Sequence, residues 1–156
     1  MATAIALVNS RAARQPTLGH LLFGLYRTLQ REVYDGLREA GFSEIRDAHS
    51  HVLRHIRPEG MRLTSLAAAA GTTKQYMTYL VNDLCALGLL EVLPDPDDGR
   101  AKRVRLTEYG QRVYDQAVSI SRALERRWAR RVGVERMQSL RDVMQTLLTE
   151  DTDAMS

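Results

Sequence analysis

The sequence is poor in cysteine and lacks a long apolar run, and these absences exclude several classes of protein. Its 156 residues include one cysteine, Cys85, so no disulfide can form within the chain, which fits a reducing compartment. No apolar stretch approaches the roughly 18 residues that a membrane-spanning helix needs. The first residues, MATAIALVNSRAAR, place basic residues after the short apolar piece, which is the wrong order for a signal peptide. We therefore expect a cytoplasmic protein.

The motifs by which many enzymes are identified are missing as well. The chain has no Gly-rich phosphate loop, no nucleophile elbow and no pair of carboxylates in an apolar context. His51 and His55 lie four residues apart, a spacing at which two imidazoles can share a metal ion, but no Glu follows His51 in an HExxH pattern. We therefore expect no enzymatic activity, no cofactor and no metal site.

Helical apolar patterns account for most of the chain. The composition is 44% hydrophobic, which is enough for a packed core. Apolar residues recur at helical spacing in the first and last parts of the chain. We predict a flexible arm over residues 1–16, a single domain over 17–150 and a polar tail over 151–156. Within the domain, long helices over 17–40 and 111–150 flank a lobe over 43–110, which gives a mainly α fold of α+β type.

The lobe shows a specific order of elements. A possible short strand over residues 61–63 precedes a small Ala-rich helix over residues 65–70, which we expect Thr64 to cap. A turn at Gly71 leads into a second helix over residues 74–87. Short strands over 89–93 and 102–106 then enclose a polar hairpin tip over 94–101, and Thr107 caps a long helix. This order predicts a winged helix-turn-helix, a shape that commonly places one helix and one hairpin against duplex DNA.

The helix over residues 74–87 has one apolar and one polar face. At 100° per residue, Met77, Leu80, Val81 and Leu84 share the face that must be buried. The opposite face carries amides and hydroxyls suited to base edges and phosphates, on Gln75, Thr78, Tyr79 and Asn82. The helix N-terminus, where free N–H groups favour a phosphate, holds Thr72, Thr73 and Lys74. We predict DNA contacts from these seven residues, although an ordinary surface helix can show the same pattern.

The hairpin adds basic residues beside this helix. The net charge of +3 is too small to indicate nucleic-acid binding, so the distribution of charge must decide. Arg103 and Arg105 alternate with apolar residues, which predicts that they face outward beside Lys102. Asp98 lies two residues before Arg100 and can hold its guanidinium for a narrow minor groove. We predict DNA contacts from Arg100, Lys102 and Arg103, with a solvated charged turn as the alternative.

These segments resemble the MarR family of bacterial transcriptional regulators. The resemblance rests on LAAAAGTTKQ across the turn, LVNDLCALGLLE from the second helix into the strand, DPDDGRA on the wing and LTEYG in the next helix. It implies an obligate homodimer that pairs the first and last helices and reads a pseudo-palindromic operator. It also implies that Arg100 enters the minor groove with Asp98 as its brace. Val92 and Leu93 depart from the family, since many members carry basic residues there.

The resemblance further implies a small-molecule effector, often aromatic and anionic, between the dimer helices and the lobe. Tyr26, Arg46 and His49 are the lining residues that we predict, and a buried side chain making one ordinary hydrogen bond is the alternative for each. Cys85 is either a redox switch or a half-buried small hydrophobe. The expected function is a sequence-specific repressor that an effector releases from DNA. A winged-helix protein-interaction module without DNA binding is the alternative.

Overall fold

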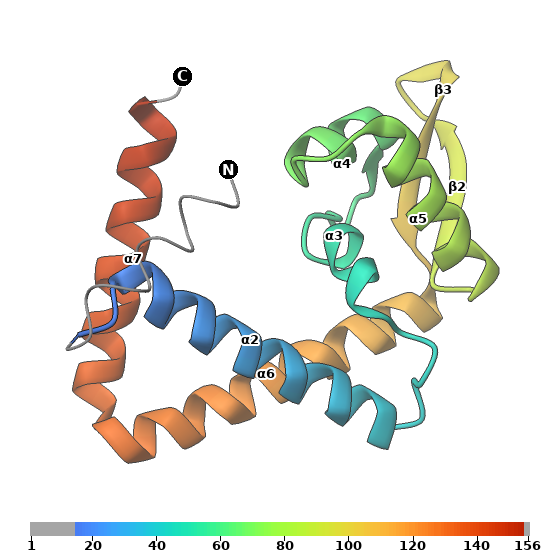
Figure 1. Ribbon diagram of the computed structural model, residues 1–156. Coiled ribbons are helices and arrows are strands. Elements are labelled where there is room, and N and C mark those ends of the chain that lie inside the picture. The colour runs from blue at the N-terminus through green and yellow to red at the C-terminus, as the bar shows by residue number, and fades with distance from the viewer. Residues whose placement is uncertain (1–14, 155–156) are drawn as a thin grey trace.

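The computed structural model describes residues 15–154, and at residues 99 and 150–154 it describes the backbone alone. Two long helices, α2 (Leu18–Glu39) and α6 (Glu108–Val132), lie across one side of a lobe of short helices and strands, and α7 (Val134–Ala154) extends away from the end of α6 (Figure 1). The predicted arm over residues 1–16 falls almost entirely outside the described residues. The helix α7 continues to Ala154, past residue 150 where we expected the polar tail to begin.

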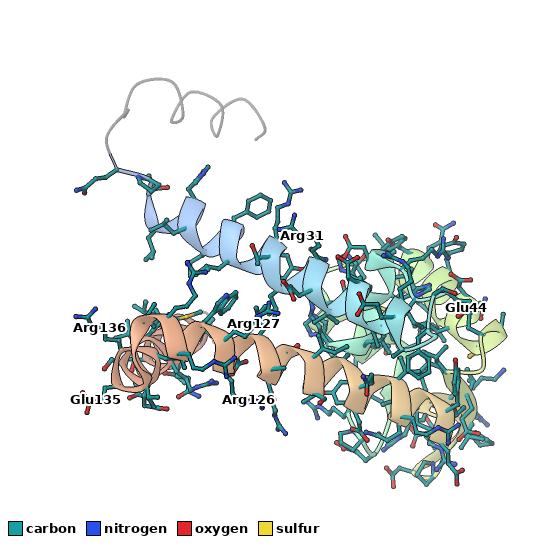
Figure 2. All side chains as sticks on the ribbon, turned by 90° about the horizontal axis from the view of Figure 1, so that it is seen from below. Arg31, Glu44, Arg126, Arg127, Glu135 and Arg136 are labelled. Carbon is teal, nitrogen blue, oxygen red and sulfur yellow. The ribbon has the colours of Figure 1, made fainter. Side chains whose placement is uncertain are left out.

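The long helices form where the sequence supplies caps and an apolar stripe. The Thr17 hydroxyl accepts a hydrogen bond from the backbone N–H of His20 and caps α2, and Thr107 caps α6 through the N–H of Gly110. Leu37 of α2 is buried in the core, and α2 packs along α6. Arg127 projects from α6 toward α2, where it pairs with Glu32 at 2.8 Å, whereas Arg126 points away from α2 (Figure 2).

The helix-turn-helix consists of α4 (Leu63–Ala69) and α5 (Lys74–Ala86). Gly71 between them adopts φ +59°, a left-handed conformation that glycine tolerates and that turns the chain sharply. The Thr73 hydroxyl accepts from the N–H of Tyr76 and caps α5. The predicted cap at Thr64 is wrong, because α4 begins at Leu63, two residues before the predicted start, and the residue at its cap position is Arg62, which makes no side-chain cap. Before α4 come η1 (Asp47–His49) and α3 (Ser50–Leu53).

The wing is a three-stranded antiparallel sheet in the order β1-β3-β2. β1 (Met61–Arg62) pairs with β3 (Asp98–Leu106), which pairs with β2 (Leu90–Asp95) in a register that sets Val92 against Val104. Both hairpin strands are longer than the sequence predicted, since pairing continues to Asp95 and Asp98 and leaves only residues 96–97 between the strands. The expected loop over residues 94–101 is therefore mostly strand.

The core lies inside the lobe and includes one face of α5. The four apolar residues predicted to be buried on α5, Met77, Leu80, Val81 and Leu84, are at most 3% exposed. The start of α6 joins this core at Gly110, where an added Cβ would collide with the carbonyl group of Leu89. None of the described helices is both long and apolar enough to cross a membrane.

Candidate nucleic-acid interface

The outer face of α5 presents uncharged polar side chains to solvent. Gln75, Tyr79 and Asn82 are exposed, as the helical period predicted. Thr78 is half-buried, and its hydroxyl donates to the Lys74 carbonyl at 2.7 Å, so it retains only acceptor capacity for a base or phosphate. Tyr76 was missed, although it is 39% exposed and stacks on Tyr79 with ring centroids 6.5 Å apart. The spacing of three residues between the two tyrosines was the available signal.

The three residues predicted to contact DNA at the N-terminus of α5 have different surroundings. Thr73 is exposed, but its hydroxyl oxygen already accepts the N–H of Tyr76 at 3.2 Å. Lys74 is exposed in the first turn of α5, where its charge faces solvent, and Thr72 is half-buried in the turn. Lys74 therefore offers a charge at this end of the helix, and Thr73 mainly fixes where the helix begins.

A buried carboxylate organises the wing. Asp95 is 2% exposed and accepts from Arg62 Nε at 2.6 Å, from Arg103 Nη2 at 3.3 Å and from the backbone N–H of Asp97 at 3.0 Å. The hydrogen bond from Arg62 is the main cause that lowers the pKa of Asp95, and the same bond raises the pKa of Arg62. Asp95 thus stays ionised, and its hydrogen bonds order the hairpin almost to its tip.

Arg103 faces the wing's own carboxylates, contrary to the outward orientation that strand alternation predicted. Its side chain is about three-quarters buried, and Nη2 lies 3.3 Å from both Asp95 and Asp97. Arg105 pairs with Glu91 across the strands at 2.7 Å. Among the described residues, no ion pair includes Arg100 or Lys102, and both are exposed. These two residues are the wing's available cations.

Asp98 is placed differently from the predicted brace. Its Oδ1 accepts the backbone N–H of Arg100 at 3.1 Å, and its Oδ2 lies 3.6 Å from Arg62 Nη2. The described ion pairs include none between Asp98 and the Arg100 guanidinium. The carboxylate therefore shapes the backbone that carries Arg100 and leaves the guanidinium itself unbraced.

Of the three predicted effector residues, Tyr26 lines a cavity. This cavity of about 440 Å³ lies between α2, α3 and α6 and is mainly apolar, with Tyr34, Arg54 and Tyr114 among its polar-tipped residues. Arg54 stacks on Tyr26 with its guanidinium carbon 4.7 Å from the ring centroid. A second cavity of about 360 Å³ shares Tyr26 and Arg54 and adds His51 and His55. Sequence reasoning missed Arg54 because its relation to Tyr26 is tertiary.

Arg46 and His49 line neither of these two cavities, so the cavities give no support to the effector contact predicted for them. His49 is fully buried and its Nε2 lies 2.8 Å from Asp83 Oδ2 on α5, and Arg46 contacts the same oxygen. These contacts direct both side chains toward α5 and away from the cavities.

Two further candidates have simple surroundings. No group of three metal-ligating side chains occurs within the described part of the chain, where His51 stacks edge-on against Tyr76 with centroids 6.1 Å apart. Cys85 is half-buried, and burial raises the pKa of its thiol, which disfavours the reactive thiolate at neutral pH.

Comparison with known proteins matches the part of the chain that contains the helix-turn-helix and most of the wing. The model of the MarR family matches residues 43–101. A MarR-family transcriptional regulator from Rhodococcus sp. RHA1 is 25% identical, covers 85% of this chain and 96% of its own, and superposes with a TM-score of 0.65. CouR from Rhodococcus jostii RHA1, solved bound to p-coumaroyl-CoA, is 26% identical with coverages of 83% and 90% and a TM-score of 0.64.

A third similar structure contains nucleic acid. A point mutant of MepR from S. aureus, bound to an oligodeoxyribonucleotide, is 18% identical, with coverages of 87% and 99% and a TM-score of 0.57. A search of curated proteins found no significant match.

Proposed function

We propose, since this chain belongs to the MarR family of winged-helix transcriptional regulators, that it is a homodimeric repressor of a pseudo-palindromic operator. One observation carries the proposal. The exposed polar face of α5, with Gln75, Tyr79 and Asn82, lies beside a wing whose exposed, unpaired cations are Arg100 and Lys102. A helix rich in amides and hydroxyls suits base edges, and an arginine on a hairpin suits a minor groove. The MepR complex with an oligodeoxyribonucleotide supports the assignment.

The exposed apolar side chains of α2 and α7 support a dimer. Large hydrophobic residues stand exposed along both helices: Leu18, Leu21, Leu22, Phe23 and Leu25 on α2, and Val134, Leu140, Val143, Met144 and Leu147 on α7. A soluble monomer rarely exposes so many neighbouring apolar groups, and a second copy related by a two-fold axis would cover them. A two-fold axis would also present two α5 helices to half-sites about one DNA turn apart.

The cavity between α2, α3 and α6 supports an effector site. Tyr26, stacked with Arg54, offers an aromatic face and a cation to a planar anion. CouR was solved with p-coumaroyl-CoA, an aromatic group joined to a polyanion. The effector releases DNA by binding more tightly to the conformation in which the two α5 helices are wrongly spaced for the operator.

The test starts with selection of duplexes from a random pool by the purified protein. The proposal expects an inverted repeat whose affinity falls steeply with salt, because phosphate contacts release counterions. Arg100→Ala should then weaken binding by about 1–3 kcal/mol on an A/T-rich flank, with the dimer intact. Arg105→Ala is the matched control, since Glu91 already holds that guanidinium at 2.7 Å. Equal losses in the two variants would remove the wing tip from the interface.

One observation favours the alternative of a protein-interaction module. Asp95, Asp97 and Glu91 neutralise three of the arginines on or beside the wing, namely Arg62, Arg103 and Arg105, so the sheet offers DNA fewer charges than its sequence suggests. Failure to enrich any duplex, together with weak binding, would favour this alternative over the operator-binding reading.

A further inference from the structure

The segment formed by Arg46 and η1 lies between the recognition helix α5 and helix α2. Its residues alternate between the two neighbours. Arg46 and His49 reach α5, whereas Asp47 reaches α2 and Ser50, which follows η1, lines both cavities. A short segment that binds both helices through separate side chains is placed to relate their positions.

The contact with α5 centres on His49. This side chain is fully buried, and its Nδ1 accepts the backbone N–H of Arg46 at 3.1 Å. Because Nδ1 accepts, the ring proton is on Nε2, which donates to Asp83 Oδ2 at 2.8 Å. The hydrogen bond from His49 is the main cause that lowers the pKa of Asp83. A buried imidazole thus holds a carboxylate of the recognition helix in a fixed direction.

Arg46 extends the same contact to the DNA-facing side of α5. Its guanidinium contacts Asp83 Oδ2, and hydrogen bonds to Tyr79 and then Asp83 raise the pKa of Arg46. Tyr79 and Asp83 lie four residues apart, so they are neighbours on successive turns of the helix. Tyr79 is 57% exposed on the face that the proposed function assigns to DNA. Arg46 therefore reaches the side of α5 on which Tyr79 lies.

The contact with α2 uses the opposite side of η1. Gln30 of α2 donates from Nε2 to Asp47 Oδ1, and the Tyr34 hydroxyl donates to the Asp47 carbonyl at 3.4 Å. Gln30 and Tyr34 both line the larger cavity. A molecule entering that cavity would meet these two side chains, and the segment they hold is the one that holds α5.

We propose that Arg46 and His49 are positioning residues for DNA reading, which through Asp83 fix recognition helix α5 to the η1 segment and so to the cavity wall on α2. The two residues touch no base themselves and act by fixing the direction of α5. The assignment rests on the proposed function, because it needs an operator that α5 reads. It gives Arg46 and His49 a role other than the effector contact expected from the sequence.

The contact of Arg46 and His49 with Asp83 is called the clamp below. Asp83→Asn tests it because loss of the charge and loss of the positioning contact should change DNA affinity in opposite directions. Removing a negative charge from a DNA-facing helix should strengthen binding to any duplex. Loss of the charge-assisted contacts should instead weaken the selected operator by at least about tenfold. Affinities for the selected operator and for a scrambled duplex are measured at one salt concentration. We expect the operator affinity to fall and the scrambled-duplex affinity to hold or rise.

A matched control and a second variant exclude general effects. Asp115→Asn makes the same charge change on α6, where the exposed carboxylate accepts from Gln111 of its own helix at 2.9 Å, and should leave operator selectivity unchanged. Arg46→Gln removes the exposed partner and should lower operator selectivity with the thermal midpoint nearly unchanged. Selectivity that is unchanged in both Asp83→Asn and Arg46→Gln overturns the clamp, as does an equal fall on both duplexes.

The connection to the cavity wall is tested by combining variants. Gln30→Ala removes one of the two α2 contacts of η1, and its effect on operator selectivity should be largely lost when Asp83→Asn is already present, because both act through one segment. Additive effects overturn the connection between α2 and α5. A wild-type protein that selects no duplex overturns the proposed function itself, whereas a selective wild type whose selectivity is unchanged in both Asp83→Asn and Arg46→Gln overturns the clamp alone.

Discussion

The lobe over residues 43–110 and the helices outside it differ in how they treat apolar residues. Among the described residues, thirteen of the 16 buried core hydrophobic residues lie in the lobe, from Ile45 to Val104. Thirteen of the 16 large hydrophobic residues that are exposed in the described part of the chain lie outside it, on α2, on α7 and at the end of α6. The same kind of side chain is therefore enclosed within one region and presented to solvent by the other.

The difference indicates which region can close its own core. The lobe buries one face of α5 against short helices and a sheet, so its stability comes from contacts within the chain. The first half of α2 and most of α7 have no comparable cover among the described residues. Because about 25 cal/mol is gained for each Å² of apolar surface removed from water, these helices gain most from a second copy. In the proposed dimer, the lobe reads DNA and the helices set the distance between two lobes.

The largest expected effect is the loss of dimerisation when charges are introduced on α7. We expect Leu140→Glu combined with Leu147→Glu to weaken dimerisation by more than about a thousandfold, since each change places an unpaired carboxylate in an apolar interface. The lobe should keep its fold, because both residues lie outside it and are exposed. Sedimentation across a concentration series gives the dimer dissociation constant. Circular dichroism reports whether the helices remain.

The adjacent positions supply a control for this pair. Ser139→Glu combined with Thr146→Glu adds the same two charges one residue earlier on the helix, where the side chains are already polar and exposed. That variant should remain dimeric. A dimer of unchanged strength in the Leu140 and Leu147 variant would show that α7 is not the dimer interface.

Truncating a side chain in the lobe core should lower the free energy of unfolding and leave the proposed dimer contact unchanged. Leu84→Ala removes a fully buried side chain from α5, and we expect it to lower the free energy of unfolding by about 2–5 kcal/mol. Chemical denaturation measures the change. Val92→Ala on β2 is the control, because Val92 is 41% exposed and its truncation should cost less than about 1 kcal/mol. Similar costs for the two variants would mean that the lobe lacks the independent core described above.

The recognition helix and its neighbours illustrate what could be predicted from the sequence. The faces of α5 were predicted correctly because four apolar residues at helical spacing leave one solution for which side is buried. The cap at Thr107 and the turn at Gly71 follow from local hydrogen bonding and backbone conformation. These features depend on residues within about four positions of one another, which is the range over which sequence patterns are reliable.

The carboxylate contacts could not be predicted because they join distant parts of the chain. Asp95 is 33 residues from Arg62, and Asp83 is 34 residues from His49. Strand alternation alone turned Arg103 toward solvent, whereas the buried Asp95 draws its guanidinium inward. Arg46 and His49 were assigned to the effector cavity from their place on the chain, but the direction of each side chain depends on Asp83. Tertiary charge pairing decided each of these cases.

A substitution at the junction between the lobe and α6 should have a smaller effect on the stability of the protein. Gly110 at the start of α6 contacts the Leu89 carbonyl so closely that an alanine Cβ would collide with it. We expect Gly110→Ala to destabilise the protein by about 1–3 kcal/mol, the usual cost of overpacking. Gly24→Ala is the control on α2, where no atom lies within 4 Å of the added Cβ, and it should stabilise the helix by up to about 1 kcal/mol. Thermal unfolding of both variants measures the difference.

The smallest expected effect is the response of the lobe to acid. The pKa of Asp95 and the pKa of Asp83 are both lowered in the folded protein below the ordinary value of 3.8. Groups of this kind contribute stability above pH 3.8 and lose it as the pH falls through the lower folded value, because the unfolded chain then binds more protons. We therefore expect the unfolding temperature of the lobe to decrease as the pH is lowered beyond about 4.

Asp95→Asn separates this effect from general acid denaturation. The variant cannot gain a proton at residue 95, so its stability should change less with pH between about 4 and 2 than that of the wild type. Its stability at pH 7 should be lower, since the amide gives Arg62 and Arg103 no charge. The proposed dimer contact on α7 rests on apolar side chains, and the ion pair described for that helix joins exposed Arg141 to Glu125 of α6, so dimer strength should change less over that range. Identical pH profiles for Asp95→Asn and the wild type would show that the wing carboxylate contributes nothing to the acid sensitivity of the lobe.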